Sequence, residues 1–202
     1  MTTHAMTNEF QRGTESLPFA ALRTVAEVGA ETGFFLSPTG PLRFFLRGKP
    51  DAPPLLILHG MGDTGPGWGP VIPRLARHFR VHALDLPGHG LSVAPGDWRF
   101  DTMLSAVRAY AQSLEKPVLV GHSLGGWLGA RLALEGAVPL RALVLVNPAG
   151  AALSREAWEE FRTRVDAQDV RAARLYLKLA FHVPPPLLWL FPKEVLKVMQ
   201  AP

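Results

Sequence analysis

Cysteine is absent from the 202 residues, so the chain cannot form a disulfide, a zinc–thiolate site or a cysteine nucleophile. Long apolar runs are absent too. Residues 117–130, one of the longest uncharged stretches, are interrupted by His122 and several glycines, whereas a membrane span needs about 20 mostly apolar residues. Basic residues form no continuous block, and the formal net charge is only +4. We therefore expect no membrane span and no nucleic-acid partner.

The N-terminal segment lacks the apolar stretch of a secretory signal. We expect a polar N-terminal extension over residues 1–20 and a cytoplasmic location. Hydrophobic residues make up 48% of the chain and charged residues 19%, a composition that excludes disorder. A chain of this length buries roughly 70% of its unfolded surface, so it needs no metal or disulfide to fold.

Short apolar segments alternate with helical patterns between residues 42 and 146. The pattern predicts strands at 42–47, 55–59, 81–86, 118–121 and 140–146, and helices at 71–79, 103–114 and 124–134. Asp101 or Thr102 is the expected N-cap of the second of these helices. Fully apolar strands separated by helices are typical of a parallel sheet covered on both faces. We predict an α/β fold over residues 21–150, with a mostly parallel sheet flanked by helices.

The pattern changes after Gly150, where no further strand is predicted. Helices are expected at 154–166, 170–181 and 194–199, with a break at Pro184-Pro185-Pro186. We interpret residues 151–202 as a helical cap. Basic residues crowd the first two of these helices, and they form either a solvated face or a surface for acidic partners or anionic membranes. They are Arg155, Arg162, Arg164, Arg171, Arg174 and Lys178.

One glycine motif, Gly60-Met61-Gly62-Asp63-Thr64-Gly65, follows a predicted strand, and Asp85 comes twenty residues after Gly65. This is the outline of a dinucleotide-binding fingerprint. In that fold the third glycine opens a helix that holds the pyrophosphate. Here prolines and further glycines follow Gly65 at once, and a bulky His59 precedes the motif. A dinucleotide-binding oxidoreductase therefore stays a less favoured alternative.

A second motif, Gly121-His122-Ser123-Leu124-Gly125-Gly126, lies between a predicted strand and a predicted helix. G-x-S-x-G in this context is a nucleophile elbow. The sharp turn strains the serine backbone, and glycines at 121 and 125 let strand and helix approach each other. The turn presents the Ser123 hydroxyl at the positive N-terminus of the helix.

Beside such a serine, the Gly60–Gly65 motif is better explained as part of an oxyanion hole than as a dinucleotide-binding loop. Acyl transfer needs two backbone N–H groups aimed at the developing oxyanion, each contributing about 3 kcal/mol. We expect these from Met61 and from Leu124, the residue after the nucleophile. Gly60 and Gly62 would let the loop turn tightly enough to present its amide. The supporting roles expected of the two neighbouring histidines are orientation of this loop by His59 and packing by His122.

The chain resembles the α/β-hydrolase superfamily in its cap-bearing branch. The resemblance covers about residues 40–150 and rests on four motifs in the family's order: Leu56–Gly62, Asp85–Ser92, Gly121–Gly126 and Leu143–Gly150. It implies a cap over the site after the sixth strand and a serine hydrolase that needs no cofactor. It also implies cleavage of an ester, thioester or related carbonyl bond through an acyl-enzyme, with a small, hydrophobic acyl substrate.

The triad acid and base are missing from their expected places. In this fold they follow the nucleophile in the order acid, then histidine, but only 79 residues follow Ser123. The single histidine among them is His182, and Asn147 stands where an acid could follow a strand. We expect a chain that ends inside its cap, with an unpaired sheet edge that favours self-association. The alternative function is a catalytically silent, truncated hydrolase fold that acts by binding.

Two further groups of side chains receive structural interpretations. Asp85 is expected to pin its own turn, and His89 to serve a structural role beside it. His78 and His82 have the spacing of a helical zinc pair, but a strand is predicted between residues 80 and 84, so they would not share a helical face. We predict no metal site.

Overall fold

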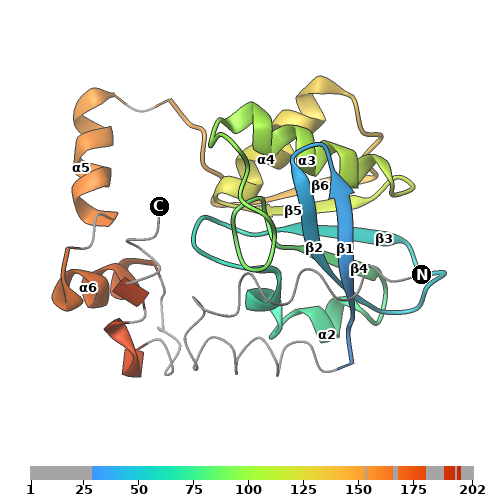
Figure 1. Cartoon of the computed structure of the whole chain (residues 1–202), viewed down its shortest axis with the longest axis horizontal. Helices are drawn as coiled ribbons and strands as arrows, with labels where there is room; N and C mark the ends of the chain where they lie inside the picture. Colours follow the sequence, from blue (N-terminus) through green and yellow to red (C-terminus); the bar gives the residue numbers. More distant parts are fainter. Residues whose placement is uncertain (1–28, 153, 166–167, 181–188, 194, 197–202) are drawn as a thin grey trace. The chain divides into compact units, whose positions relative to one another are not determined.

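The computed structural model describes residues 29–152, 154–165, 168–180, 189–193 and 195–196 (Figure 1). These divide into two compact units with the boundary after Gly150. The expected extension over residues 1–20, His182 and the break at Pro184–Pro186 lie outside the described residues, as does most of the helix expected at 194–199. In the described part of the chain, no helix is long and apolar enough to cross a membrane.

The first unit is built on a sheet with the order β1-β2-β4-β3-β5-β6. Its strands are β1 (Glu31–Ser37), β2 (Gly40–Arg47), β3 (Pro54–Leu58), β4 (Arg80–Leu84), β5 (Val118–His122) and β6 (Ala142–Val146). The last four run parallel, whereas β1 and β2 pair antiparallel with each other and β2 pairs antiparallel with β4. The predicted α/β fold with a mostly parallel sheet is confirmed.

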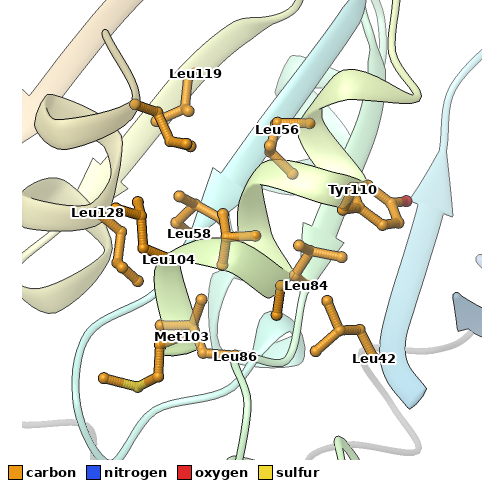
Figure 2. Close-up of a cluster of buried hydrophobic side chains, with 14 of the residues drawn as sticks. Leu42, Leu56, Leu58, Leu84, Leu86, Met103, Leu104, Tyr110, Leu119 and Leu128 are labelled. Carbon is orange, nitrogen blue, oxygen red and sulfur yellow. The ribbon is translucent and has the colours of Figure 1, made fainter. Parts of the chain in front are cut away.

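Helices cover both faces of this sheet, as Figure 1 shows. On one face lie α3 (Phe100–Gln112) and α4 (Leu124–Glu135); on the other lie the short 3₁₀ helix η1 (Gly65–Trp68) and α2 (Ile72–Leu75). Alternate residues of β3 point to opposite faces of the sheet and pack into two separate hydrophobic clusters. Leu56 and Leu58 pack under α3 and α4 (Figure 2), and Leu55 and Ile57 pack toward η1 and α2. Each such buried leucine contributes about 2 kcal/mol of hydrophobic stabilisation.

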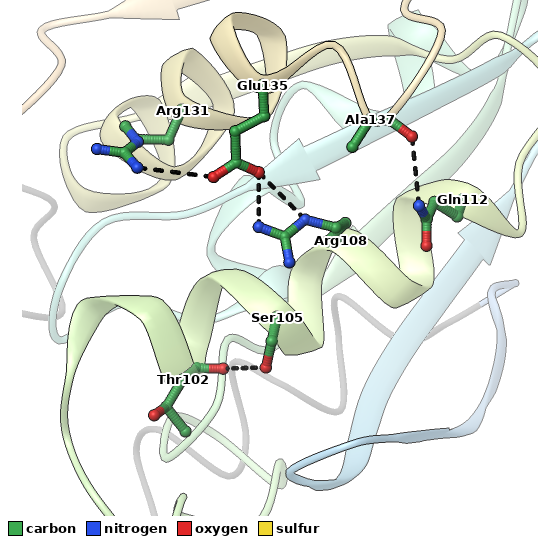
Figure 3. Close-up of polar contacts among 7 residues, drawn as sticks. All are labelled: Thr102, Ser105, Arg108, Gln112, Arg131, Glu135 and Ala137. Atoms are coloured by element: carbon green, nitrogen blue, oxygen red, sulfur yellow. Dashed lines mark hydrogen bonds and ion pairs between the residues drawn. The ribbon is translucent and has the colours of Figure 1, made fainter.

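Polar contacts join α3 to the end of α4 (Figure 3). The Arg108 guanidinium donates from Nη2 and Nε to Glu135 Oε2, at 2.5 and 3.2 Å. Gln112 Nε2 donates to the Ala137 carbonyl at 3.2 Å. The Arg108–Glu135 pair is about 30% exposed on each side, so it orients the two helices more than it stabilises them.

One strand was missed and two local predictions were wrong, because contacts outside the local pattern decide these segments. Strand β1 was not predicted; it forms because all seven of its residues pair with β2 across a tight turn. The helix expected at 71–79 is a helix only over Ile72–Leu75, because the following residues tighten into turns before β4. Helix α3 begins after Arg99 rather than at Asp101 or Thr102, since the earlier Asp97 carboxylate already accepts the Arg99 N–H and the Thr102 hydroxyl.

The second unit contains α5 (Arg155–Val165) and α6 (Val170–Ala180), close to the bounds that the sequence predicts. A side chain caps each N-terminus. Ser154 Oγ accepts the Ala157 N–H at 3.2 Å, and Asp169 Oδ1 accepts the Ala172 N–H at 2.7 Å. The unit's buried apolar cluster, as far as the described residues show it, is small: Ala173, Leu177 and Val195.

Candidate active site

Ser123 occupies the turn between β5 and α4 in a strained backbone conformation, with φ 49° and ψ −114°. A non-glycine residue holds such angles only where its surroundings fix them. Here they do. The Ser123 N–H donates to the Val146 carbonyl at 3.1 Å, and the Ser123 carbonyl accepts the N–H groups of Trp127 at 3.0 Å and Ala149 at 2.9 Å. The chain after β6 thus locks the turn from the side.

Two glycines allow β5, α4 and β3 to approach at this turn. A Cβ on Gly121 would lie 2.4 Å from the Gly125 carbonyl oxygen, and a Cβ on Gly125 would lie 2.3 Å from the Leu58 carbonyl oxygen. Both distances are far below contact, and both partners are backbone atoms that cannot swing aside. Any larger residue would therefore push the Ser123 turn away from β3.

The loop after β3 lies directly against Ser123. The Gly125 N–H donates to the His59 carbonyl at 3.1 Å, and a Cβ on Gly60 would lie 3.2 Å from Ser123 Cβ. Gly62 has φ +72°, which lets the loop reverse after Met61. Met61 is 73% exposed, so its side chain is not packed within the loop.

Leu124 opens helix α4, so its N–H belongs to the first turn and has no intrahelical acceptor. The amides on either side of it are satisfied, that of Ser123 by Val146 and that of Gly125 by His59. The helix N-terminus places partial positive charge beside the Ser123 hydroxyl. The structure therefore brings Ser123, the Leu124 amide and the Gly60–Gly62 loop to one edge of the sheet.

His59 is fully buried and both of its ring nitrogens are occupied. Nε2 accepts the Leu86 N–H at 2.9 Å, so the proton sits on Nδ1, which donates to the Gly60 carbonyl at 2.6 Å. Burial lowers the pKa of His59 to about 3, helped by the charges of His89 and His122 and opposed by the Gly60 bond. A neutral imidazole with no free nitrogen holds the loop in place and cannot accept the Ser123 proton.

Asp85 is buried at the end of β4 and ties two loops together. Its Oδ1 accepts the Gly65 N–H at 2.8 Å, and its Oδ2 accepts the Leu91 N–H at 3.0 Å. In a dinucleotide fold, this amide and this carboxylate would face the ligand. Here they bind each other, and Gly65 opens only the four residues of η1. The loop geometry is not that of a dinucleotide cradle.

The remaining described histidines have separate surroundings. His122 is half-buried with its ring edge-on to Trp68 at 6.5 Å. His89 lies with Nδ1 3.1 Å from the Pro87 carbonyl, and burial lowers its pKa. His82, in β4, pairs through Nδ1 with the Tyr110 hydroxyl at 2.9 Å, and burial lowers its pKa to about 4. His78 lies outside α2, so His78 and His82 share no helix.

Neither an acid nor a base completes a triad within the described residues. Asn147 follows β6 with φ 41° and is exposed. No histidine in the ranges that the structure describes hydrogen-bonds Ser123. The same ranges hold no cluster of three potential metal ligands.

Sequence reasoning missed Asp63, which lies two residues beyond Met61 in the same loop. Its Oδ1 accepts the Thr64 N–H at 2.8 Å, and a Cβ on Gly67 would lie 2.1 Å from that oxygen. Burial raises the pKa of Asp63, while the Thr64 N–H and the His122 charge oppose the rise. An acid within a run of glycines was the available signal, because such loops fold tightly over their own side chains.

Residues 55–200 match the model of the Alpha/beta hydrolase family. This chain belongs to the α/β-hydrolase family. The match begins with β3 and includes the Gly60–Gly62 loop, Asp85 and the Ser123 turn. The family resemblance that the sequence motifs indicate is confirmed.

Curated relatives include two pimeloyl-[acyl-carrier protein] methyl ester esterases. The chain is 34% identical over 113 residues to that of Aeromonas hydrophila subsp. hydrophila, covering 56% of this chain and 44% of the relative. It is 36% identical over 104 residues to that of Proteus mirabilis, covering 52% and 40%. The chain thus aligns with less than half the length of these relatives.

Solved structures share the fold over most of this chain. Naproxen esterase (carboxylesterase NP) from Bacillus subtilis has a TM-score of 0.74 and 18% identity, covering 92% of this chain and 68% of that one. A hydrolase from Pseudomonas aeruginosa PA01 has a TM-score of 0.65 and 29% identity, covering 85% and 67%. At 18% identity the first likeness concerns the fold alone.

Proposed function

We propose that this chain carries the nucleophile and the oxyanion site of an ester-hydrolysing serine enzyme. The observation that supports this most is the strained Ser123, fixed between β5 and α4, with its Cβ 3.2 Å from the position that a Cβ on Gly60 would occupy. Strain of this kind persists where function requires it, and the site lies at the carboxyl edge of a parallel sheet.

In the proposed reaction Ser123 Oγ attacks the ester carbonyl carbon and loses its proton to a base. The carbonyl oxygen becomes an oxyanion, held by the N–H groups of Met61 and Leu124. Collapse of this intermediate breaks the ester C–O bond, and the alcohol leaves with the proton from the base. Water then attacks the acyl-enzyme, which releases the acid and restores the hydroxyl.

We place the base outside the described residues, because no histidine within them hydrogen-bonds Ser123. His59 has no free nitrogen, and His82 is engaged by Tyr110. His89 faces the Pro87 carbonyl. Without a base a serine hydroxyl is a weak nucleophile, although the oxyanion site and binding alone still give about a 10³-fold acceleration over water.

We infer a small ester with a hydrophobic acyl group as the substrate class. The support comes from the curated relatives, which include methyl ester esterases. The names of these proteins describe whole enzymes, of which this chain matches a part.

A second candidate function is binding without turnover, and Asn147 is the observation that favours it. An amide at the end of β6 cannot carry the charge of a triad acid. A chain with the elbow and no acid–base pair would bind an ester or acid at the same edge and release it unchanged.

Hydrolysis of p-nitrophenyl esters of increasing acyl length tests the proposal. We expect wild-type turnover above the uncatalysed rate and its loss in Ser123→Ala. The matched control is Ser105→Ala, which removes a hydroxyl that donates to the Thr102 carbonyl within α3. Equal rates for wild type and Ser123→Ala would contradict the nucleophile. A folded wild type that binds the ester in equilibrium dialysis but does not cleave it would establish the second candidate.

A further inference from the structure

Helix α6 has one buried side and one cationic side. Ala173 and Leu177 are buried with Val195. The exposed side carries Arg171, Arg174, Leu175 and Lys178, at the spacing of one continuous helical stripe. Leu175 is 54% exposed, so the stripe combines charge with an apolar side chain.

Trp189 lies against the same stripe. The Arg174 guanidinium carbon is 5.9 Å from the centroid of its ring, and Lys178 Nζ is 5.6 Å from it. These are cation–π distances. The ring nevertheless stays 37% exposed, and the next residue, Leu190, is 70% exposed. We call Arg171, Arg174, Leu175, Lys178, Trp189 and Leu190 the cationic–aromatic patch.

The cations of this patch are not neutralised by any carboxylate that the structure describes. Arg162 on α5 offers a contrast, because its Nε lies 3.2 Å from Glu159 Oε2. The nearest acid in sequence, Asp169, caps the helix through the Ala172 N–H. Three positive charges therefore stand beside exposed leucines and a tryptophan, all within the second unit.

We propose that the cationic–aromatic patch binds the surface of an anionic lipid membrane, with α6 lying in the interface. Arginine and lysine attract the lipid phosphates, while tryptophan and leucine enter the boundary between headgroups and acyl chains. A lipid surface offers phosphates to the cations and an apolar layer to the tryptophan and the leucines at the same time. The contact is peripheral, and it does not depend on the chemistry proposed for Ser123.

Flotation of the full chain with lipid vesicles tests this proposal. We expect binding to phosphatidylcholine vesicles that contain phosphatidylglycerol, weaker binding as salt rises, and little binding to pure phosphatidylcholine. Each cation near an anionic surface contributes roughly a fivefold increase in binding. Arg174→Gln with Lys178→Gln should therefore weaken binding about 25-fold, and Trp189→Ala should weaken it further.

The matched control removes the same charge from the other unit. Arg74→Gln with Arg77→Gln alters two exposed cations in and after α2, and we expect binding close to wild type. Equal loss in both double variants would reduce the effect to net charge and overturn the proposal, as would equal binding to neutral vesicles or no binding at all. Thermal unfolding of each variant checks that α6 stays folded. Binding of an acidic protein to these residues, with no vesicle binding, would overturn the lipid assignment in favour of a protein partner.

Discussion

Two glycine-rich turns lie side by side at the carboxyl edge of the sheet, and they use their glycines differently. In the Gly121–Gly126 turn, glycine is needed because backbone stands within 2.4 Å of where a Cβ would be. In the Gly60–Gly65 loop, the atoms nearest to a Cβ on Gly60 or Gly65 are side-chain atoms, at 3.0 and 2.9 Å, and Gly62 has φ +72°. This loop is held by side-chain hydrogen bonds, from His59 at one end and to Asp85 at the other. Spacing alone makes the two motifs look alike, whereas the atoms around each glycine distinguish them.

This difference separates packing from hydrogen bonding as causes of rigidity. The Ser123 turn tolerates no added atom, so its sensitivity is steric. The neighbouring loop depends on buried polar groups that must stay hydrogen-bonded, so we expect its stability to fall when one of these groups changes its protonation state or loses its partner. Each of the predictions below acts on one of the two.

The largest effect is expected at Gly125. Gly125→Ala places a methyl group 2.3 Å from the Leu58 carbonyl oxygen and 2.6 Å from the His59 carbonyl oxygen, and neither can rotate away. We expect a loss of about 4 kcal/mol in the free energy of unfolding, measured by urea denaturation. Gly96→Ala is the control, since nothing lies within 4 Å of its added carbon, and it should change stability by less than about 0.5 kcal/mol. Similar values for the two would refute the steric account.

Asp85→Ala tests the neighbouring loop. It leaves the buried Gly65 N–H and the Leu91 N–H without their acceptor, and each unpaired group costs about 1–3 kcal/mol. We expect a loss of about 3 kcal/mol in urea denaturation, with Asp85→Asn retaining part of the stability because one amide oxygen still accepts. A change no larger than that of Asp51→Ala, at an exposed position, would show that the loop does not need the carboxylate.

The pH dependence of stability reports on His59. Its folded-state pKa of about 3 lies below the unfolded value of 6.5, so the unfolded chain takes up the proton first as pH falls. Stability is therefore complete above pH 6.5 and is lost toward pH 3, by about 2 kcal/mol between pH 7 and pH 5 from this residue. His82 adds to the loss in the same direction.

Urea midpoints measured from pH 7 to pH 5 check this, with His59→Gln expected to flatten the dependence. The control, His78→Gln, alters an exposed histidine in the turn after α2 and should retain the fall in the urea midpoint, because His59 is still present. If the wild-type urea midpoint stays constant as the pH is lowered below 6.5, His59 is not held neutral by its surroundings.

The smallest effect is expected at Asp63. Burial raises the pKa of this carboxyl, so the charged form at pH 7 costs stability in the folded state. Asp63→Asn removes the charge and keeps an oxygen that can accept the Thr64 N–H, so we expect a gain of about 0.5 kcal/mol at pH 7. The gain should vanish at pH 3, where the wild-type carboxyl is protonated. Thermal unfolding of both proteins at the two pH values measures this. A loss of stability in Asp63→Asn at pH 7 would contradict the prediction.

The sequence was sufficient to predict elements whose pattern is local. The parallel strands read as apolar segments because both of their faces are covered, and the glycines at 121 and 125 marked the turn at Ser123. Strand β1 carries no such pattern, since it is an edge strand that exists through its pairing with β2. The N-cap of α3 was misplaced for a similar reason, because Asp97 acts from outside the helical pattern.

At the site, residue type predicted chemistry better than it predicted contacts. The position of His59, directly before the Gly60–Gly62 loop, was enough to predict that it would orient this loop. The sequence did not predict that both ring nitrogens are hydrogen-bonded, because one partner, the Leu86 N–H, is distant in sequence. The burial of Asp63 was not predicted, because it depends on how the glycine-rich loop folds over this side chain. The acid and base of the proposed reaction stay a prediction, since no described residue supplies them.

Labelling with a fluorophosphonate probe, followed by intact mass and peptide mapping, tests the central claim most directly, because the probe reacts only with an activated serine. The account predicts one label, on Ser123, that persists in Ser105→Ala and disappears in Ser123→Ala. A folded wild-type chain that takes up no label, or a label that Ser123→Ala leaves in place, would contradict it.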